Sequence, residues 1–374
     1  MKIYIFGWFG FNNTGDNLIL QKEFEYMQEY FSNNTLTIVG NYSNLLNILG
    51  NETEFNSVDH NGKNYLKMFL KADFIIYGGG GLFPHQNTKQ LLILLLGSLI
   101  MKIRNKRIGY IGLGIGGVQT KFDLMIWKLI IKMSSIFYTR DDVLLKQLKV
   151  EQNKYISEMP DIVFSLNNSK RMMKQISPGM VVSVALANIF INDIRKYEEF
   201  LEEMEKFFKL LLSSGYSVKL YSFTKGVDEK LNNDLCSRLN SSQCICISYS
   251  EKDDIIDTFV DSDIIISMRF HGCVLSAIYN IPFIGISYSH KTEALMNKLD
   301  VSDFIVKYCR SENEYYGEVI NIEYLELWDI FNKLNTDYEI ISDKLRLQTV
   351  NYSHQVSEKF KLLKDLLKEN QEDK

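Results

Sequence analysis

The sequence predicts an α/β fold: two Rossmann-like, doubly wound parallel-sheet domains that face a cleft, followed by C-terminal helices. Two observations predict this fold. Short apolar runs alternate with longer segments of helical periodicity. This alternation occurs twice, in two series separated by a polar, turn-rich stretch at 167–179. A length of 374 residues suits two or three domains, so we predict domains at 1–175 and 176–312 and a helical segment at 313–374 that packs back on them.

In the first half, five apolar runs predict the strands of one sheet. They are 2–8, 36–40, 73–77, 107–113 and 135–139. Between and after them, apolar residues recur at helical spacing. The expected helices are 17–31, 89–102, 122–133 and 142–149. The strand-helix alternation favours parallel strands with helices on both faces of the sheet.

The second half repeats the pattern. Its expected strands are 180–186, 217–223, 244–248, 263–268, 282–288 and 304–307. Its expected helices are 197–213, 228–239, 253–260, 272–279 and 292–299. From residue 322 onwards the sequence has helical periodicity throughout. In such sheets ligands bind outside the carboxyl ends of the strands, so the strand ends are where we look for the site.

Composition narrows the class of protein. With 46% hydrophobic residues and only four prolines, the chain can bury a large core and is neither disordered nor fibrous. A net charge of −4 argues against a dedicated nucleic-acid binder, because phosphate neutralisation needs a clustered basic excess. The chain enters its first apolar run at residue 2 without the pattern of a signal peptide, so we expect a cytoplasmic protein.

The five cysteines show none of the paired spacing of a zinc site. We interpret them as buried, reduced thiols, as suits a reducing cytoplasm. Cys244 and Cys246 alternate along an apolar run, which points both thiols to the same face of a strand. The histidines also lack metal-ligand spacing, and the sequence therefore predicts no metal site.

The longest apolar stretch, 91–101, is about half the ~20 residues that a membrane-spanning helix needs. Four basic residues lie just beyond it: Lys102, Arg104, Lys106 and Arg107. We interpret the stretch as a buried helix with a solvated basic end, because it is apolar on all sides. A peripheral contact with anionic lipid is the alternative.

A loop containing Asn13, Gly15 and Asp16 connects the first strand to a helix. The N–H groups at the start of that helix offer a favourable place for an anion, and glycine lets the backbone approach it closely. Asp16 could equally be the helix N-cap.

Glycines also end the third and fourth strands. The candidates for binding substrate there are Gly79, Gly80 and Gly81 after the third strand, and Gly114 and Gly116 after the fourth. Glycine runs at strand ends favour close approach of a ligand. A tight structural crossover is the alternative interpretation.

Charged side chains follow three further strands. Arg140 ends the fifth strand, where it can bind a carboxylate or phosphate, or pair with Asp141 or Asp142. Arg269 and His271 follow the buried run 263–268 and come just before Gly272 and a new helix. An anchoring cation thus lies beside a titratable imidazole, which is typical of catalytic sites.

At these residues the chain resembles the polysaccharide pyruvyl transferase family. The resemblance covers about residues 1–310 and rests on seven segments in matching order: 13–16, 78–81, 112–116, Arg140 with Asp141, 160–164, 267–272, and Tyr288 with Lys291. Two positions depart from the family pattern. Phe270 stands where many relatives have leucine, and Leu144 stands where a serine often follows the Arg-Asp pair.

The resemblance implies a fold of the GT-B kind and transfer of the enolpyruvyl unit of phosphoenolpyruvate onto two hydroxyls of a sugar. The acceptor would be a cell-surface polysaccharide or its precursor, free or lipid-linked, and no cofactor would be needed besides this co-substrate. Arg269 and His271 match the family's catalytic motif. Arg140, Tyr288, Lys291, Phe270 and Gly272 would contact substrate. Lys291 could instead be an ordinary solvated surface charge.

The residues themselves suit this chemistry. Phosphoenolpyruvate carries a phosphate and a carboxylate, which call for fixed cations and N–H donors. Ketal formation needs a proton delivered to the methylene carbon, and an imidazole can supply it at neutral pH. Two other functions remain open: a nucleotide-sugar glycosyltransferase, and a non-catalytic glycan-binding relative.

Overall fold

The computed structural model describes residues 1–50, 53–83, 88–115, 120–166, 180–190, 193–249, 254–310, 318–319 and 322–368. The chain divides into two compact units. Unit 1 comprises residues 1–11, 16–165 and 352–374, and unit 2 comprises 12–15 and 166–351. The predicted domain boundary at 175/176 lies outside the described residues.

Unit 1 contains, among its described residues, an eight-stranded sheet in the order β3-β2-β1-β4-β6-β7-β8, with β5 paired to β6. The strands are β1 (Lys2–Phe6), β2 (Thr35–Val39), β3 (Asn56–Val58), β4 (Phe74–Tyr77), β5 (Gly80–Phe83), β6 (Arg107–Ile115), β7 (Ile136–Thr139) and β8 (Ile156–Glu158). The pairings are parallel. All four side chains of β4 are buried, as expected for a parallel strand covered on both faces.

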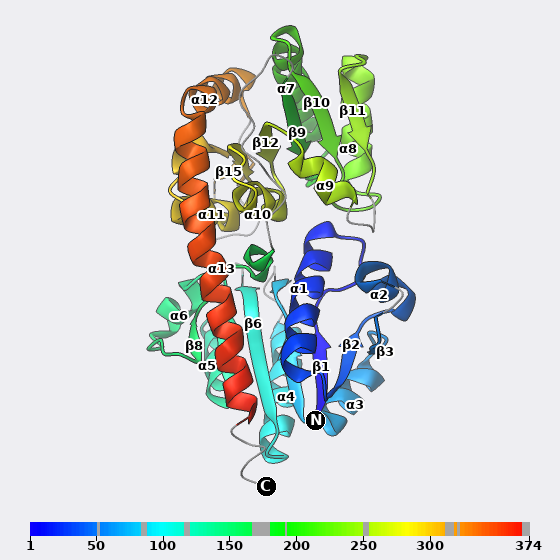
Figure 1. Ribbon diagram of the computed structural model, residues 1–374, viewed down its shortest axis with the longest axis vertical. Coiled ribbons are helices and arrows are strands. Elements are labelled where there is room, and N and C mark those ends of the chain that lie inside the picture. Colours follow the sequence, from blue (N-terminus) through cyan, green and yellow to red (C-terminus); the bar gives the residue numbers. More distant parts are fainter. Residues whose placement is uncertain are drawn as a thin grey trace. The chain divides into compact units, whose positions relative to one another are not determined.

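The helices of unit 1 cover both faces of this sheet. They are α1 (Thr14–Phe31), α2 (Tyr42–Leu49), α3 (Gly62–Lys71), α4 (Thr88–Ile103), α5 (Lys121–Met133) and α6 (Val143–Leu148). Helices α3, α4 and α5 share one hydrophobic core with β4, β6 and β7. Helix α1 and the end of α13 (Tyr338–Lys368) run across the other face (Figure 1), where the rings of Tyr26 and Phe360 stack 4.1 Å apart.

Unit 2 repeats the plan with a six-stranded sheet, counted over its described residues, in the order β11-β10-β9-β12-β13-β14. The strands are β9 (Val181–Ala185), β10 (Ser217–Tyr221), β11 (Cys244–Ile247), β12 (Ile264–Ser267), β13 (Phe283–Ser287) and β14 (Ile305–Lys307), with a small ribbon of β15 (Cys309–Arg310) and β16 (Glu318–Val319) beside them. The helices are α7 (Ile194–Ser213), α8 (Asp228–Leu239), α9 (Asp254–Val260), α10 (Phe270–Ile278), α11 (His290–Lys298) and α12 (Tyr324–Thr336).

The predicted fold class, two doubly wound parallel-sheet units with C-terminal helices, is confirmed. In both sheets the chain order reverses at the first strand, so the crevice expected to bind ligands lies beside β1 and β4 in unit 1 and beside β9 and β12 in unit 2. The sequence patterns missed α2, α3, β3, β5 and β8. These elements are short, and α3 buries only two side chains, Met68 and Phe69.

The interpretation of 91–101 as a buried helix is wrong. Only one side of α4 packs inward, through residues such as Leu91, Leu94 and Met101. The opposite side is exposed, from Leu92 at 44% to Ile103 at 76%. No helix among the described residues has the length and hydropathy needed to cross a bilayer.

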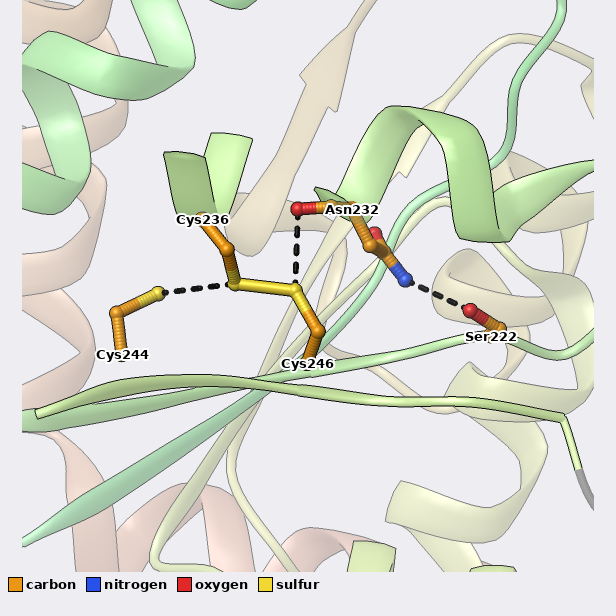
Figure 2. Close-up of a disulfide and its surroundings, with 5 residues drawn as sticks. All are labelled: Ser222, Asn232, Cys236, Cys244 and Cys246. Atoms are coloured by element: carbon orange, nitrogen blue, oxygen red, sulfur yellow. Dashed lines mark hydrogen bonds between the residues drawn. A yellow bond between two sulfur atoms is a disulfide. The ribbon is translucent and has the colours of Figure 1, made fainter. Parts of the chain in front are cut away.

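The expectation that all the cysteines are reduced is also wrong. Cys236 on α8 forms a disulfide with Cys246 on β11, as Figure 2 shows, whereas Cys244 and Cys273 are free and buried. The Cys244 sulfur lies 3.8 Å from that of Cys236, so Cys244 and Cys246 do face the same side of the strand. The sequence could not show that α8 carries a third thiol to this face.

Candidate active site

In unit 2, the predicted catalytic pair lies at the carboxyl end of β12, next to β9. Arg269 occupies the N-cap position of α10, and His271 lies in the first turn of that helix. The Ser267 hydroxyl donates to the backbone carbonyl of Arg269 over 2.8 Å and holds this turn. Gly272 lets the helix start so close to the strand, because a Cβ there would lie 2.2 Å from the Ser267 oxygen.

The Arg269 guanidinium is fixed by Asp228, the first residue of α8. Its Nε donates to Asp228 Oδ2 over 3.1 Å, and Nη2 donates to Oδ1 of the same carboxylate. The Asp228 side chain is fully buried, and that of Arg269 is 18% exposed. Asp228 Oδ2 also accepts the backbone N–H groups of Phe223 and Thr224, at 3.1 and 2.9 Å. One buried carboxylate therefore sets the position of both Arg269 and the loop after β10.

That loop binds the segment 12–15, which belongs to unit 2 by its contacts. The backbone N–H of Thr14 donates to the carbonyl of Phe223 over 3.0 Å, and Lys225 N–H donates to the carbonyl of Asn12 over 3.1 Å. The Asn13 side chain reaches the Thr224 hydroxyl at 3.4 Å. Asn13 also accepts the N–H of Gly15 at 2.9 Å, which fixes the turn into α1.

Gly15 lies directly against the imidazole of His271, the predicted acid/base. A Cβ at this position would lie 1.9 Å from His271 Nδ1. Only glycine leaves room for the ring there. The predicted residues Asn13, Gly15, Arg269 and His271 are thus brought together in unit 2, through Asp228.

The remaining predicted residues of unit 2 lie nearby in sequence. Phe270 packs its ring edge-on against that of His271, with centroids 5.3 Å apart. Tyr288 follows β13, and Lys291 lies in the first turn of α11; both are half-buried. Their contact with substrate stays a prediction.

In unit 1, Arg140 follows β7 and pairs with a carboxylate that the sequence analysis did not consider as its partner. Its Nη1 lies 2.7 Å from Oδ2 of Asp161, and both side chains are almost completely buried. Asp161 Oδ1 accepts the N–H of Val163 at 3.0 Å. Gly114 is needed for this arrangement, since a Cβ there would lie 2.3 Å from Arg140 Nη2. The alternative partners Asp141 and Asp142 instead bind the Val143 N–H and Lys146.

The glycine run 78–81 lies against carboxyl groups. Gly79 N–H donates to Oε1 of Glu23 over 2.7 Å, and a Cβ at Gly78 would lie 2.1 Å from Oε2. Gly80 has φ +105°, and a Cβ there would lie 3.1 Å from Asp16 Oδ1. Close packing of the chain therefore accounts for glycine at 78–80. A substrate role for Gly79, Gly80 and Gly81 stays a prediction, and Gly116 lies outside the described residues.

Glu23 is a buried carboxyl group beside the predicted glycine run that the sequence analysis missed. It is 1% exposed, and in the described part of the chain nothing hydrogen-bonds its Oε2. Burial raises its pKa from 4.5 to about 8, against the lowering effect of the Gly79 N–H, and the nearby Asp161 raises it further. Glu23 follows Asp16 on α1 by seven residues, two helical turns, which is the only sequence signal that could have indicated it.

Comparison with known proteins decides the family. The family model described as polysaccharide pyruvyl transferase matches residues 13–290, about three quarters of the chain. The chain belongs to this family. The match begins at Asn13 and includes Arg140, Arg269 and His271, so the resemblance predicted from the sequence is confirmed. No individual protein of curated function matches the sequence.

Solved structures share the fold at low sequence identity. UDP-GlcNAc 2-epimerase from Neisseria meningitidis, bound to UDP-GlcNAc, matches with a TM-score of 0.61 and 11% identity over 99% of this chain and 100% of that one. Anabaena HepE, in complex with UDP and glucose, matches with a TM-score of 0.60 and 10% identity over 98% and 99%. Staphylococcus aureus MnaA with UDP gives 0.57 and 10% over 92% and 91%. These similarities establish a GT-B-like fold for this member of the pyruvyl transferase family.

Proposed function

We propose that this transferase moves the enolpyruvyl unit of phosphoenolpyruvate onto two hydroxyls of a sugar, in a cell-surface polysaccharide or its lipid-linked or free precursor, in the cytoplasm. The observation that carries the proposal is the linked arrangement of Gly15, His271, Asp228 and Arg269 in unit 2. It places an imidazole and a guanidinium at the start of one helix and fixes both through Asp228 and Gly15. Membership of the family supports the choice of reaction.

The reaction balances in two steps. One sugar hydroxyl adds to C2 of phosphoenolpyruvate while a proton goes to the methylene carbon, which becomes a methyl group. A second hydroxyl then displaces the phosphate, which leaves with that hydroxyl's proton, and the product is a pyruvate ketal. No metal or other cofactor is needed to balance either step, and we expect turnover to survive treatment with a chelator.

The residues of unit 2 suit these needs. Arg269 and the N-terminus of α10 provide a charged donor and backbone N–H groups for the phosphate or carboxylate. His271 is the proposed acid/base that delivers the proton to the methylene carbon, a role typically worth about 10²–10⁴-fold in rate. Tyr288 and Lys291 are also proposed to contact substrate. Arg140 of unit 1 stays a separate candidate for binding substrate.

The test is a comparison of ligands and variants. Phosphoenolpyruvate at about 100 times its Kd should stabilise the protein by about 2.7 kcal/mol, and nucleotide sugars should not. His271→Ala should keep this stabilisation and lose phosphate release with a glycan acceptor, whereas Arg269→Ala should lose both. Stabilisation by UDP-sugars alone would favour a nucleotide-sugar enzyme such as a glycosyltransferase; the Neisseria structure holds UDP-GlcNAc and the Anabaena structure holds UDP and glucose. Glycan binding without phosphate release would favour a binding protein.

A further inference from the structure

Helices α3, α4 and α5 of unit 1 form one layer with an unusual outer face. Their inner sides share a core that includes Met68, Leu94 and Trp127. Gly97 brings α4 close to α3, because a Cβ there would lie 2.2 Å from the ring of Phe69. Helices α3 and α4 are therefore close neighbours, and α5 shares their core. We call the outer sides of the three helices together the α3–α5 face.

The centre of the α3–α5 face is an apolar stripe along α4. Leu92, Leu96, Leu99 and Ile103 recur at intervals of three or four residues, so they project from the same side of the helix. Their exposed fractions are 44%, 57%, 44% and 76%, and the neighbouring Ile93 is 52% exposed. Isolated exposed leucines are ordinary on protein surfaces, but a stripe of this length is not.

The flanking helices extend the apolar surface. On α5, Phe122, Met125 and Leu129 are 49%, 53% and 43% exposed. On α3, Leu66 and Leu70 are each 53% exposed. Large groups of exposed apolar side chains on neighbouring helices are typical of sites of interaction with another protein or with a membrane.

The charge on these helices favours a membrane. Exposed lysines accompany the apolar residues on each of them: Lys63, Lys67 and Lys71 on α3, Lys89 and Lys102 on α4, and Lys121, Lys128 and Lys132 on α5.

The only acidic residue in the three helices is Asp123. It is fully buried and bound to the Thr88 hydroxyl and, as part of a capping box, to Thr120. The layer thus concentrates positive charge on a chain whose net charge is −4.

We propose that the α3–α5 face docks this enzyme onto an anionic lipid bilayer. The apolar side chains would enter the boundary between headgroups and acyl chains while the lysines contact anionic headgroups, as in helices that lie in the plane of a membrane. A second copy of the chain is a poor occupant, because a symmetric contact would bring lysines against lysines. This proposal does not depend on the reaction assigned above.

The experiment is co-sedimentation of the full-length protein with vesicles, without any substrate. Vesicles of phosphatidylcholine with about 30% phosphatidylglycerol should bind the protein, and pure phosphatidylcholine should bind it at least about tenfold more weakly. Binding should fall as salt is raised to about 0.5 M, because screening weakens the lysine contacts.

Two pairs of substitutions test the two components separately. Leu96→Glu with Leu99→Glu should abolish binding. Lys128→Glu with Lys132→Glu should weaken it by about fivefold or more for each lysine. The matched controls are Leu347→Glu with Val350→Glu on α13, both 67% exposed, and the exposed Lys361→Glu; these should bind as the wild type does. Because the lysine pair is exposed on the surface, it remains informative if the leucine pair does not fold.

Three outcomes would overturn the proposal. The first is no binding to anionic vesicles, and the second is equal binding by both substituted pairs and the wild type. The third is a concentration-dependent dimer that Leu96→Glu with Leu99→Glu abolishes while no variant binds vesicles differently. That result would assign the α3–α5 face to contact between two copies of the chain.

Discussion

Asp228 holds Arg269 through both of its carboxylate oxygens while it also accepts the N–H groups of Phe223 and Thr224. Because the loop at 223–225 in turn binds residues 12–14, the position of Gly15 against His271 depends on the Asp228 carboxylate. Asp228 is therefore a positioning residue. Several expected outcomes depend on this arrangement and on the carboxyl groups of unit 1.

Replacing Asp228 with asparagine should disturb Arg269 and the 223–225 loop together. The lost charge-assisted hydrogen bonds are typically worth about 1.5–3 kcal/mol, so we expect stability to fall by roughly 2 kcal/mol in urea denaturation. Phosphoenolpyruvate binding should weaken in parallel in calorimetry. The control is Glu229→Gln, which changes the next residue of α8 but no contact of Arg269. Unchanged ligand affinity in Asp228→Asn would show that Arg269 needs no such support.

Replacing Gly15 with alanine should displace the imidazole of His271. The added methyl would lie 1.9 Å from Nδ1, so the ring has to move. If His271 transfers a proton in the reaction, turnover should fall by about 100-fold or more, while the melting temperature changes little. Gly62→Ala is the matched control, since nothing lies within 4 Å of a Cβ there. Wild-type kcat in Gly15→Ala would remove His271 from the mechanism.

Glu23 should make the protein less stable as the pH rises. The pKa of Glu23 is about 8 in the folded protein, above its ordinary value of 4.5. Below about pH 4.5 the carboxyl group is therefore protonated in both the folded and the unfolded chain, and its contribution to stability is fully present. Between these values only the unfolded chain ionises, and the free energy of unfolding falls by up to about 1.4 kcal/mol per pH unit.

Glu23→Gln keeps the acceptor for Gly79 but removes this titration. Urea denaturation from pH 5 to pH 8 should therefore give a flatter profile for the variant than for the wild type. Glu25→Gln on the same helix is the control, because Glu25 is 59% exposed in its pair with Lys22. Parallel profiles for the wild type and Glu23→Gln would show that Glu23 is ionised in the folded protein.

The Cys236–Cys246 disulfide should stabilise unit 2. It joins residues ten apart in sequence. Closing a loop of that size lowers the entropy of the unfolded chain and so stabilises the folded protein by roughly 2–3 kcal/mol. The double variant Cys236→Ser with Cys246→Ser should be less stable than the oxidised wild type by that amount. Its stability should not change when reductant is added. Cys273→Ser is the control, since Cys273 is a buried free thiol. A wild type that reductant does not destabilise would contradict this expectation.

The fold could be predicted from the sequence because parallel strands are buried on both faces. Their apolar runs, such as 74–77 and 264–267, stand out in a single sequence. Most predicted elements lie within a few residues of their observed bounds. The misses include short strands such as β3 and β8, and the helix α3, in which only two side chains are buried. Helix α4 was predicted as a helix, but which of its sides is buried depends on neighbours distant in sequence.

The candidate site was predictable only in part. Glycines and charged residues at strand ends are local signals, and they indicated Gly15, Arg140, Arg269 and His271. Their partners could not be found in the same way. Asp161 lies 21 residues from Arg140, and Asp228 lies 41 residues from Arg269. Such pairs are created only when separate loops meet at one edge of a sheet.

The sequence by itself determined the fold class and the family, and it indicated the strand ends that are proposed to carry the chemistry, because periodicity and glycine-rich loops are properties of neighbouring residues. Only the tertiary structure decided which carboxylates hold Arg140 and Arg269, that Glu23 is buried against Gly79, that Cys236 meets Cys246, and that one side of α4 faces outward. Each of these features depends on the distance between residues that are far apart in the chain. Packing of the folded chain sets that distance, and the local sequence pattern does not.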